Sequence, residues 1–346
     1  MAGMIPRSDP ESSAILEDLQ QLLLDPAHAE RAPIVADMLR SLARFLRDEP
    51  DRGDLKMLNR ALKELRYAFK VFTPYRMVRK VSIFGSARTK PEEPEYAQAS
   101  HFANRMSRRG WMVITGAGSG IMEAAQGGAG RNHSFGVNIR LPFEQKANEY
   151  IAEDPKLVNF KYFFTRKVIF LKETHGIALF PGGFGTHDES FESLTLIQTG
   201  KTDILPVVFV DKPGGSYWLD WKEYVRSHLE KRGMIDPNDL DLFEVTDDPR
   251  RAVEVITGFY HNYHSSRFVR DLLVVRLHRP VSDELLDRLN TDFSDVLKSG
   301  KFERADVHPD EANDPHTHRL HRLRFDFDRR SYGRLRRLID VLNEAG

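Results

Sequence analysis

Hydrophobic positions along the chain follow three rhythms, and these divide it into three regions. From residue 12 to residue 73, leucines and other apolar residues recur at the spacing of amphipathic helices. From about residue 80, short apolar runs alternate with helical stretches, which is typical of β–α–β units. From about residue 268 that alternation is lost. The pattern therefore predicts a helical region over 1–77, an α/β domain over 78–265 and a small α+β unit over 266–346.

The central region alternates strongly enough to predict its elements individually. Apolar runs predict strands, and amphipathic stretches between them predict helices. Because crossovers between parallel strands are almost always right-handed, the expected fold class is α/β, a Rossmann-like doubly wound parallel sheet. The predicted strands cover 80–85, 111–115, 135–141, 176–180, 204–210 and 241–245, and the predicted helices cover 94–109, 160–174, 187–199, 217–231 and 249–264.

The C-terminal region shows a different order of elements. Strands are expected at 272–277, 302–307 and 319–327, and helices at 282–298 and 332–343. Apolar and polar residues alternate in the last strand, which indicates a sheet with one solvated face. Four histidines gather nearby, but their polar loop offers no pair of helical ligands, so we predict no metal site. The alternating residues are Leu323, Phe325 and Phe327, and the histidines are His308, His316, His318 and His321.

The segment Pro181–Glu189 places three glycines, a hydroxyl and a carboxylate where a strand becomes a helix. Glycine lets the backbone approach a ligand closely, and the first turn of a helix offers unpaired N–H groups to an anion. Thr186 and Glu189 also have the spacing of a capping box, but a cap requires one suitable residue and not several glycines. We therefore predict a phosphate site formed by Gly182, Gly183, Gly185 and Thr186.

Two further strand ends carry glycines and small polar residues. One is the loop from 115 to 122, whose spacing differs from the dinucleotide-binding G-x-G-x-x-G pattern. The other follows the strand at 80–85 and includes the cation Arg88. In an open parallel sheet such loops gather at the topological switch point, so together they are expected to enclose a mononucleotide. The residues predicted to bind it here are Gly85, Ser86, Gly116, Gly118, Gly120 and Met122.

These motifs resemble those of the LONELY GUY family, cytokinin riboside 5'-monophosphate phosphoribohydrolases that often carry an older label of lysine decarboxylase. Pro181–Glu189 matches the family's P-G-G-x-G-T-x-x-E motif. Arg166 and Lys167 look like its Arg-Lys pair, and Arg166 stands 23 positions before Glu189, the spacing of the family's catalytic arginine and glutamate. The second glycine loop is similar as well. The resemblance covers about residues 78–260.

The resemblance implies an enzyme that hydrolyses the N-glycosidic bond of a nucleoside 5'-monophosphate, either AMP-like or a cytokinin riboside monophosphate, to free base and ribose 5-phosphate. It implies catalytic roles for Arg166 and Glu189 and places Lys167 with the substrate-binding residues. Glu189 would either polarise the attacking water or offset positive charge on the ribosyl centre. Arg166 would keep that carboxylate ionised. No cofactor is expected.

Two other functions use the same residues differently. A non-catalytic nucleotide or molybdenum-cofactor carrier would bind its ligand in the same crevice without chemistry. A pyridoxal-dependent decarboxylase would need a Schiff-base lysine with a carboxylate for the pyridine nitrogen, and no constellation in the sequence supports it.

Composition narrows the function classes further. The 346 residues include no cysteine, which excludes disulfides, a thiolate nucleophile and a cysteine metal site. Basic and acidic residues number 51 each, so we expect neither nucleic acid nor membrane as a partner. Apolar runs fall short of the ~20 residues that span a bilayer, and the polar start lacks a signal-peptide core, so a cytoplasmic location is expected. The apolar helical stripes, with the resemblance, imply a homo-oligomer of two or more subunits.

Overall fold

The structure is a computed structural model that describes residues 10–26, 29–140 and 146–345. The chain forms two compact units, Met1–Lys63 and Glu64–Gly346. The predicted division at 77/78 and 265/266 remains a prediction. Within the described residues, none of the helices combines the length and the apolar character that crossing a bilayer requires.

Helices make up the first unit, as the apolar spacing predicts. α1 spans Pro10–Leu24, α2 spans Ala32–Arg47, and α3 (Arg52–Phe72) begins here and continues into the second unit. The carboxylate of Asp51 accepts a hydrogen bond from the amide of Asp54 at 2.8 Å, as an N-cap does, so α3 starts directly after it. α2 is described throughout and buries none of its residues. Its exposed apolar side chains are Ile34, Met38, Leu39, Leu42 and Leu46.

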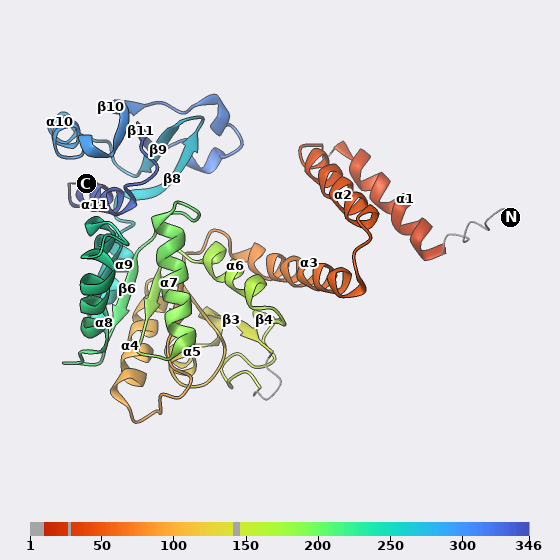
Figure 1. The fold of residues 1–346 in the computed structure, drawn as a ribbon, viewed down its shortest axis with the longest axis horizontal. Coiled ribbons are helices and arrows are strands. Elements are labelled where there is room, and N and C mark those ends of the chain that lie inside the picture. Colours follow the sequence, from red (N-terminus) through yellow and green to blue (C-terminus); the bar gives the residue numbers. More distant parts are fainter. Residues whose placement is uncertain (1–9, 27–28, 141–145, 346) are drawn as a thin grey trace. The chain divides into compact units, whose positions relative to one another are not determined.

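A parallel sheet forms the centre of the second unit (Figure 1). Among the described residues it has seven strands, in the order β4-β3-β2-β1-β5-β6-β7. The strand order changes direction between β1 and β5, so the topological switch point lies at their carboxyl ends. This confirms the predicted α/β class and the doubly wound sheet. The strands are β1 Lys80–Phe84, β2 Met112–Thr115, β3 Ser134–Ile139, β4 Leu157–Phe160, β5 Ile177–Leu179, β6 Val207–Val210 and β7 Phe243–Thr246.

Helices cover both faces of this sheet, because successive residues of a strand point to opposite faces. In β1, Val81 and Ile83 pack in the cluster that contains Phe102, whereas Phe84 packs in the cluster that contains Phe170. All residues of β1 are buried, as expected for a central parallel strand. The helices of this layer are α4 Pro94–Arg108, α5 Ile121–Ala129, α6 Phe163–Glu173, α7 Phe184–Gln198, α8 Tyr217–Val225 and α9 Pro249–Gly258.

Several predicted helix boundaries in this region are wrong, and two of them reflect strands that the sequence did not reveal. The helix expected from residue 160 starts only at Phe163, because residues up to Phe160 form the edge strand β4, whose burial alternates over too few positions to be read from sequence. The helix expected to reach residue 264 ends at Gly258. The aromatic residues that follow enter a strand that pairs with the C-terminal sheet.

The C-terminal sheet is antiparallel and has the strand order β10-β11-β9-β8 among the described residues. Leu323 and Phe325 are buried while Arg324 between them is exposed, which confirms the predicted alternation. The helix expected over 282–298 is shorter, since its last residues form strand β10. The elements are β8 Tyr263–Val269, β9 Leu272–Leu277, α10 Asp283–Asp292, β10 Leu297–Ala305, β11 His321–Phe327 and α11 Tyr332–Glu344.

A buried ion cluster occupies the loop where the four histidines gather. Glu311 has no exposed surface and accepts hydrogen bonds from Arg276 at 2.6 and 2.9 Å and from Arg322 at 3.0 Å. Burial raises the pKa of this carboxyl, but the hydrogen bonds from Arg322 and Arg276 outweigh it and bring the pKa to about 2. The described residues contain no group of three side chains able to hold a metal ion. The cluster therefore fixes the loop to the sheet.

Candidate active site

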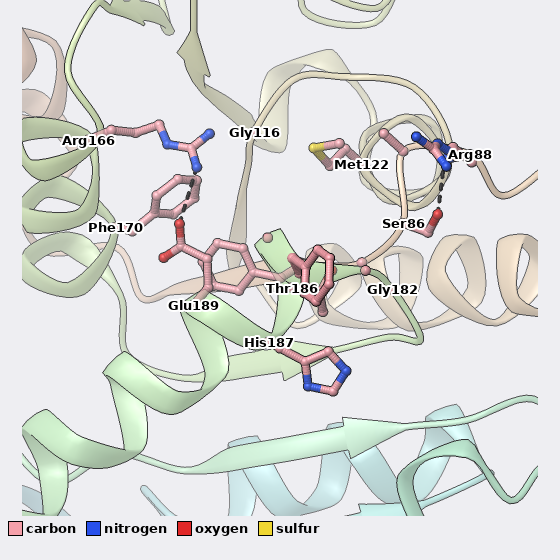
Figure 2. A pocket seen from close by; sticks show the side chains of 16 residues that line it. Ser86, Arg88, Gly116, Met122, Arg166, Phe170, Gly182, Thr186, His187 and Glu189 are labelled. Carbon is pink, nitrogen blue, oxygen red and sulfur yellow. Dashed lines mark hydrogen bonds and ion pairs between the residues drawn. The ribbon is translucent and has the colours of Figure 1, made fainter. Parts of the chain in front are cut away.

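A cavity of about 840 Å³ opens at the carboxyl ends of the adjacent parallel strands β1 and β5 (Figure 2). Its walls come from the loops that follow β1, β2 and β5 and from helices α5, α6 and α7. This is the position at which doubly wound sheets bind their ligands. The lining includes ten of the predicted site residues, namely Gly85, Ser86, Gly116, Met122, Arg166, Gly182, Gly183, Gly185, Thr186 and Glu189.

The glycine turn after β5 leads directly into α7. The helix begins at Phe184 and its N-cap is Gly183, so Thr186 lies inside the first turn and no side chain among the described residues caps this helix. The alternative of a capping box is therefore wrong. A Cβ on Gly182 would lie 2.1 Å from Oγ1 of Thr186, so only glycine fits there. A Cβ on Gly183 or Gly185 would meet nothing described within 4 Å, which leaves the first turn open to a ligand.

Ser86 joins the three loops through its backbone. Its amide donates to the carbonyl of Pro181 at 3.0 Å, and its carbonyl accepts from the amide of Ile121 at 3.0 Å, where α5 begins. The hydroxyl of Ser86 accepts from the amide of Arg88 at 3.0 Å (Figure 2). Backbone hydrogen bonds therefore hold the strand ends together, and sequence patterns do not reveal such bonds.

The glycine loop after β2 contributes few residues to the cavity lining, and its glycines mainly allow close packing. Gly120 has a φ of +64°, and a Cβ there would lie 2.3 Å from the carbonyl oxygen of Ser86, so glycine is required. Gly116 reaches the cavity, beside Met122. Gly118 and Gly120 are absent from the lining among the described residues. Gly120 lets the loop pass close to Ser86, whereas a Cβ on Gly118 would meet, of the described atoms, only the side chain of Met122.

Arg166 and Glu189 form an ion pair in the cavity wall. Nη2 of Arg166 lies 3.1 Å from Oε1 of Glu189, and the two side chains are 14% and 6% exposed (Figure 2). Burial raises the pKa of Glu189, while the charges of Arg166 and Lys167 oppose that shift. Burial likewise lowers the pKa of Arg166, with Glu189 opposing. Nε of Arg166 is buried without a hydrogen-bond partner among the described residues, so the pair is incompletely satisfied.

Lys167 lies outside the cavity lining among the described residues, although it was expected with the substrate-binding set. Its Nζ is 2.8 Å from Oδ2 of Asp188, and it also contacts Glu192. Burial lowers the pKa of this lysine, but hydrogen bonds to Asp188 and Glu192 outweigh that and raise it. Lys167 thus links α6 to α7 outside the cavity lining.

Several lining residues were missed by the sequence analysis. Phe170 stands one helical turn after Arg166, a spacing that signals a common face. Phe184 interrupts the glycines and is 97% exposed, which no pattern would separate from a core phenylalanine. Arg88 also lines the cavity, where the sequence had indicated only a cation near a strand end. The remaining missed residues are Phe84, Ala87 and His187.

Comparison with known families agrees with the geometry of this site. Residues 119–256 match the family model described as "possible lysine decarboxylase", and this stretch contains the end of the second glycine loop, Arg166 and the motif at 181–189. The match spans less than half of the chain and lies within the region, 78–260, where the sequence resembles the LONELY GUY family. The resemblance found in the sequence is thereby confirmed.

A curated protein similar to part of this chain is the pyrimidine/purine nucleotide 5'-monophosphate nucleosidase of Escherichia coli strain K12, 29% identical over 143 residues. The match covers 38% of this chain and 32% of the relative, so the chain spans about a third of that protein's length. The protein of the same name from Escherichia coli O157:H7 matches to the same extent.

Solved structures that are similar to part of the chain share low sequence identity with it. The molybdenum cofactor binding protein from Rippkaea orientalis is 16% identical, with a TM-score of 0.38, over 52% of this chain and 96% of that one. The molybdenum cofactor carrier protein from Chlamydomonas reinhardtii is 17% identical, with a TM-score of 0.36 and the same coverage. At these scores they carry no functional information.

Proposed function

We propose that this chain hydrolyses the N-glycosidic bond of a nucleoside 5'-monophosphate and releases free base and ribose 5-phosphate. The observation that carries the proposal is the Arg166–Glu189 pair at 3.1 Å, facing a cavity whose other wall is a glycine turn. The Escherichia coli relative is a nucleosidase for pyrimidine and purine nucleotide 5'-monophosphates, which supports the substrate class.

Glu189 is assigned to the reacting sugar. The C1'–N bond breaks with its electron pair leaving on the base, and the ribosyl centre acquires oxocarbenium-like charge that a nearby carboxylate stabilises. Alternatively, the carboxylate takes a proton from the attacking water, for which a raised pKa is well suited. Both roles require the ionised form, which the charge of Arg166 favours.

The 5'-phosphate is assigned to the turn before α7. The first helical turn offers N–H groups and the positive end of the helix dipole, and Gly183 and Gly185 leave the approach open. Thr186 and Ser86 add hydroxyl groups to the same wall. A cavity of about 840 Å³ is of the size that small-molecule sites usually have.

The base is assigned to the apolar side of the cavity. Phe84, Met122 and Phe170 line it, and they offer contact area without hydrogen-bonding groups that would fix one base. AMP-like nucleotides and cytokinin riboside monophosphates both remain within the proposal. A panel of nucleotides therefore has to identify the base.

The test is chromatography of free base and ribose 5-phosphate after incubation with a panel of nucleoside 5'-monophosphates. Wild type should release base, and Glu189→Gln should release almost none while still binding nucleotide. Glu254→Gln, an exposed carboxylate on α9, is the matched control and should behave as wild type. Binding without release of base in wild type would replace the hydrolase with the carrier function.

A homo-oligomer and a cytoplasmic location belong to the same proposal. The exposed apolar side chains of α2 offer a surface for a second copy of the chain. Light scattering of wild type and Leu42→Asp measures the mass in solution. A wild-type monomer would contradict the oligomer.

A further inference from the structure

Tyr217 lies next to the phosphate-binding turn without lining the cavity. Its hydroxyl oxygen is 2.5 Å from the carbonyl oxygen of Gly182 and 2.7 Å from Nε2 of His187. Gly182 and Gly183 line the cavity, whereas Tyr217 is not in the lining among the described residues. The tyrosine therefore contacts two lining residues from outside the lining.

Counting protons fixes the direction of both hydrogen bonds. The carbonyl of Gly182 can only accept, so the single proton of the Tyr217 hydroxyl is donated to it. The hydroxyl oxygen then accepts from His187, which must carry its proton on Nε2. Burial raises the pKa of Tyr217 and lowers that of His187, so the tyrosine keeps its proton and the imidazole stays neutral near pH 7.

The planar peptide bond between Gly182 and Gly183 couples the orientation of the Gly182 carbonyl to that of the Gly183 amide. In a trans peptide the C=O of Gly182 and the N–H of Gly183 point in opposite directions. Because Tyr217 fixes the direction of the Gly182 carbonyl, it also fixes the direction of the Gly183 amide, which points away from the tyrosine. Gly183 is the N-cap of α7, so its N–H adds to the unpaired amides of the first turn.

The tyrosine itself is held in place by the core. Its ring makes an edge contact with Trp218 at 4.7 Å, and Trp218 is fully buried. The amide of Trp218 donates to Oδ2 of Asp211 at 3.2 Å, which ties the start of α8 to the end of β6. Figure 2 shows His187, which also lines the cavity, projecting away from Arg166, so the contact between Tyr217 and His187 lies apart from the Arg166–Glu189 pair.

We propose that Tyr217 is a positioning residue that, through the Gly182 carbonyl, aims the Gly183 amide at the phosphate and makes the site select phosphorylated ligands. The inference rests on the proposed function in taking that phosphate to be the 5'-phosphate of a nucleotide. A purely structural role would change stability or weaken all ligands equally. A positioning role weakens only those that carry the phosphate.

The experiment compares wild type, Tyr217→Phe and the control Tyr224→Phe, an exposed tyrosine on the same helix. Calorimetry measures the affinity for ribose 5-phosphate, for a nucleoside 5'-monophosphate and for the matching nucleoside. Loss of one oriented amide should weaken the two phosphorylated ligands about tenfold in Tyr217→Phe and leave the nucleoside unchanged. Where turnover is measurable, KM rises and kcat stays within about twofold.

Equal affinities for wild type and Tyr217→Phe, or an equal loss for all three ligands, would overturn the proposal. Thermal unfolding checks that the variants are folded. Should Tyr217→Phe not fold, His187→Phe removes the second partner of the hydroxyl, and a loss of about threefold confined to phosphorylated ligands is expected, with no loss counting against the proposal. Binding does not depend on turnover, so a protein that releases no base can still show the phosphate-specific loss.

Discussion

The candidate active-site cavity and the region of the C-terminal sheet each bury a glutamate against arginine, and the pKa values of the two glutamates shift in opposite directions. In the cavity wall, Glu189 has one hydrogen bond from Arg166, and burial raises its pKa. In the C-terminal unit, Glu311 accepts from Arg276 and Arg322, and its pKa falls to about 2. The number of donors decides which effect dominates.

The difference separates a site from a structural contact. Every oxygen of Glu311 is engaged, so the carboxylate is fixed and unavailable to a ligand. Glu189 instead borders open space and keeps capacity for water or a ribose hydroxyl. An incompletely satisfied buried pair that faces a cavity is the arrangement expected where a ligand completes the bonding.

The largest expected effect is on activity. Glu189→Gln should lower the rate of base release by roughly 10³-fold, because the neutral amide neither stabilises positive charge nor accepts a proton. The free energy of unfolding should fall by less than in the Glu311→Gln variant described next, because Arg166, although it loses its counter-charge, borders the open cavity where water can reach it. Steady-state kinetics and urea denaturation measure the two effects. If the loss of activity in Glu189→Gln were accounted for by a loss of folded protein, Glu189 would be a structural residue.

Removing the other glutamate should have the reverse outcome. Glu311→Gln leaves the buried guanidinium groups of Arg276 and Arg322 without their counter-charge and should cost about 3–5 kcal/mol of stability. The rate of base release per folded molecule should stay near that of wild type. Chemical denaturation gives the stability, and activity normalised to the folded fraction gives the rate. A Glu311→Gln variant as stable as wild type would contradict the structural role of Glu311 and its contrast with Glu189.

The two carboxyls should also respond to pH at different places. The pKa of Glu311 is lower when folded, so its stabilisation is complete above pH 4.5 and is lost as pH falls toward 2, roughly 3 kcal/mol in all. The pKa of Glu189 is raised in the folded protein, so burying this carboxyl destabilises the fold least below pH 4.5, where it is protonated in both states. As the pH is lowered, Glu189 therefore loses its ionised, active form while the pH is still above 4.5. Activity should therefore decline at a higher pH than stability. A pH–kcat/KM profile beside pH-dependent unfolding tests this order.

The smallest effect is expected for an exposed pair in the same C-terminal sheet. Glu303 and Arg324 lie 3.0 Å apart, about as close as the buried pairs, but both are exposed. Glu303→Gln should change the free energy of unfolding by less than about 0.5 kcal/mol, because water screens the charges. The same denaturation experiment measures it. A loss comparable to that of Glu311→Gln would show that burial is not the deciding variable.

Much of the α/β region was predictable because its signals are local. A buried strand followed by glycine and an amphipathic helix can be recognised from the sequence of about ten residues. The strands β1, β2 and β5 and the helix α4 therefore lie close to their predicted ranges. Elements whose identity depends on a partner were missed. The short edge strand β4 and the strand β8 are defined by pairing with distant strands.

The sequence by itself determined the class of fold, the glycine turns and the residue types at positions 166 and 189, since spacing and backbone freedom are properties of the chain. Only the tertiary structure decided which of these residues meet. It brought Arg166 to 3.1 Å from Glu189, turned Lys167 outward to Asp188, and added Phe170 and His187 to the lining. The reason is physical: hydrogen-bond partners and desolvation arise from packing between distant segments, which set the opposite pKa shifts of Glu189 and Glu311.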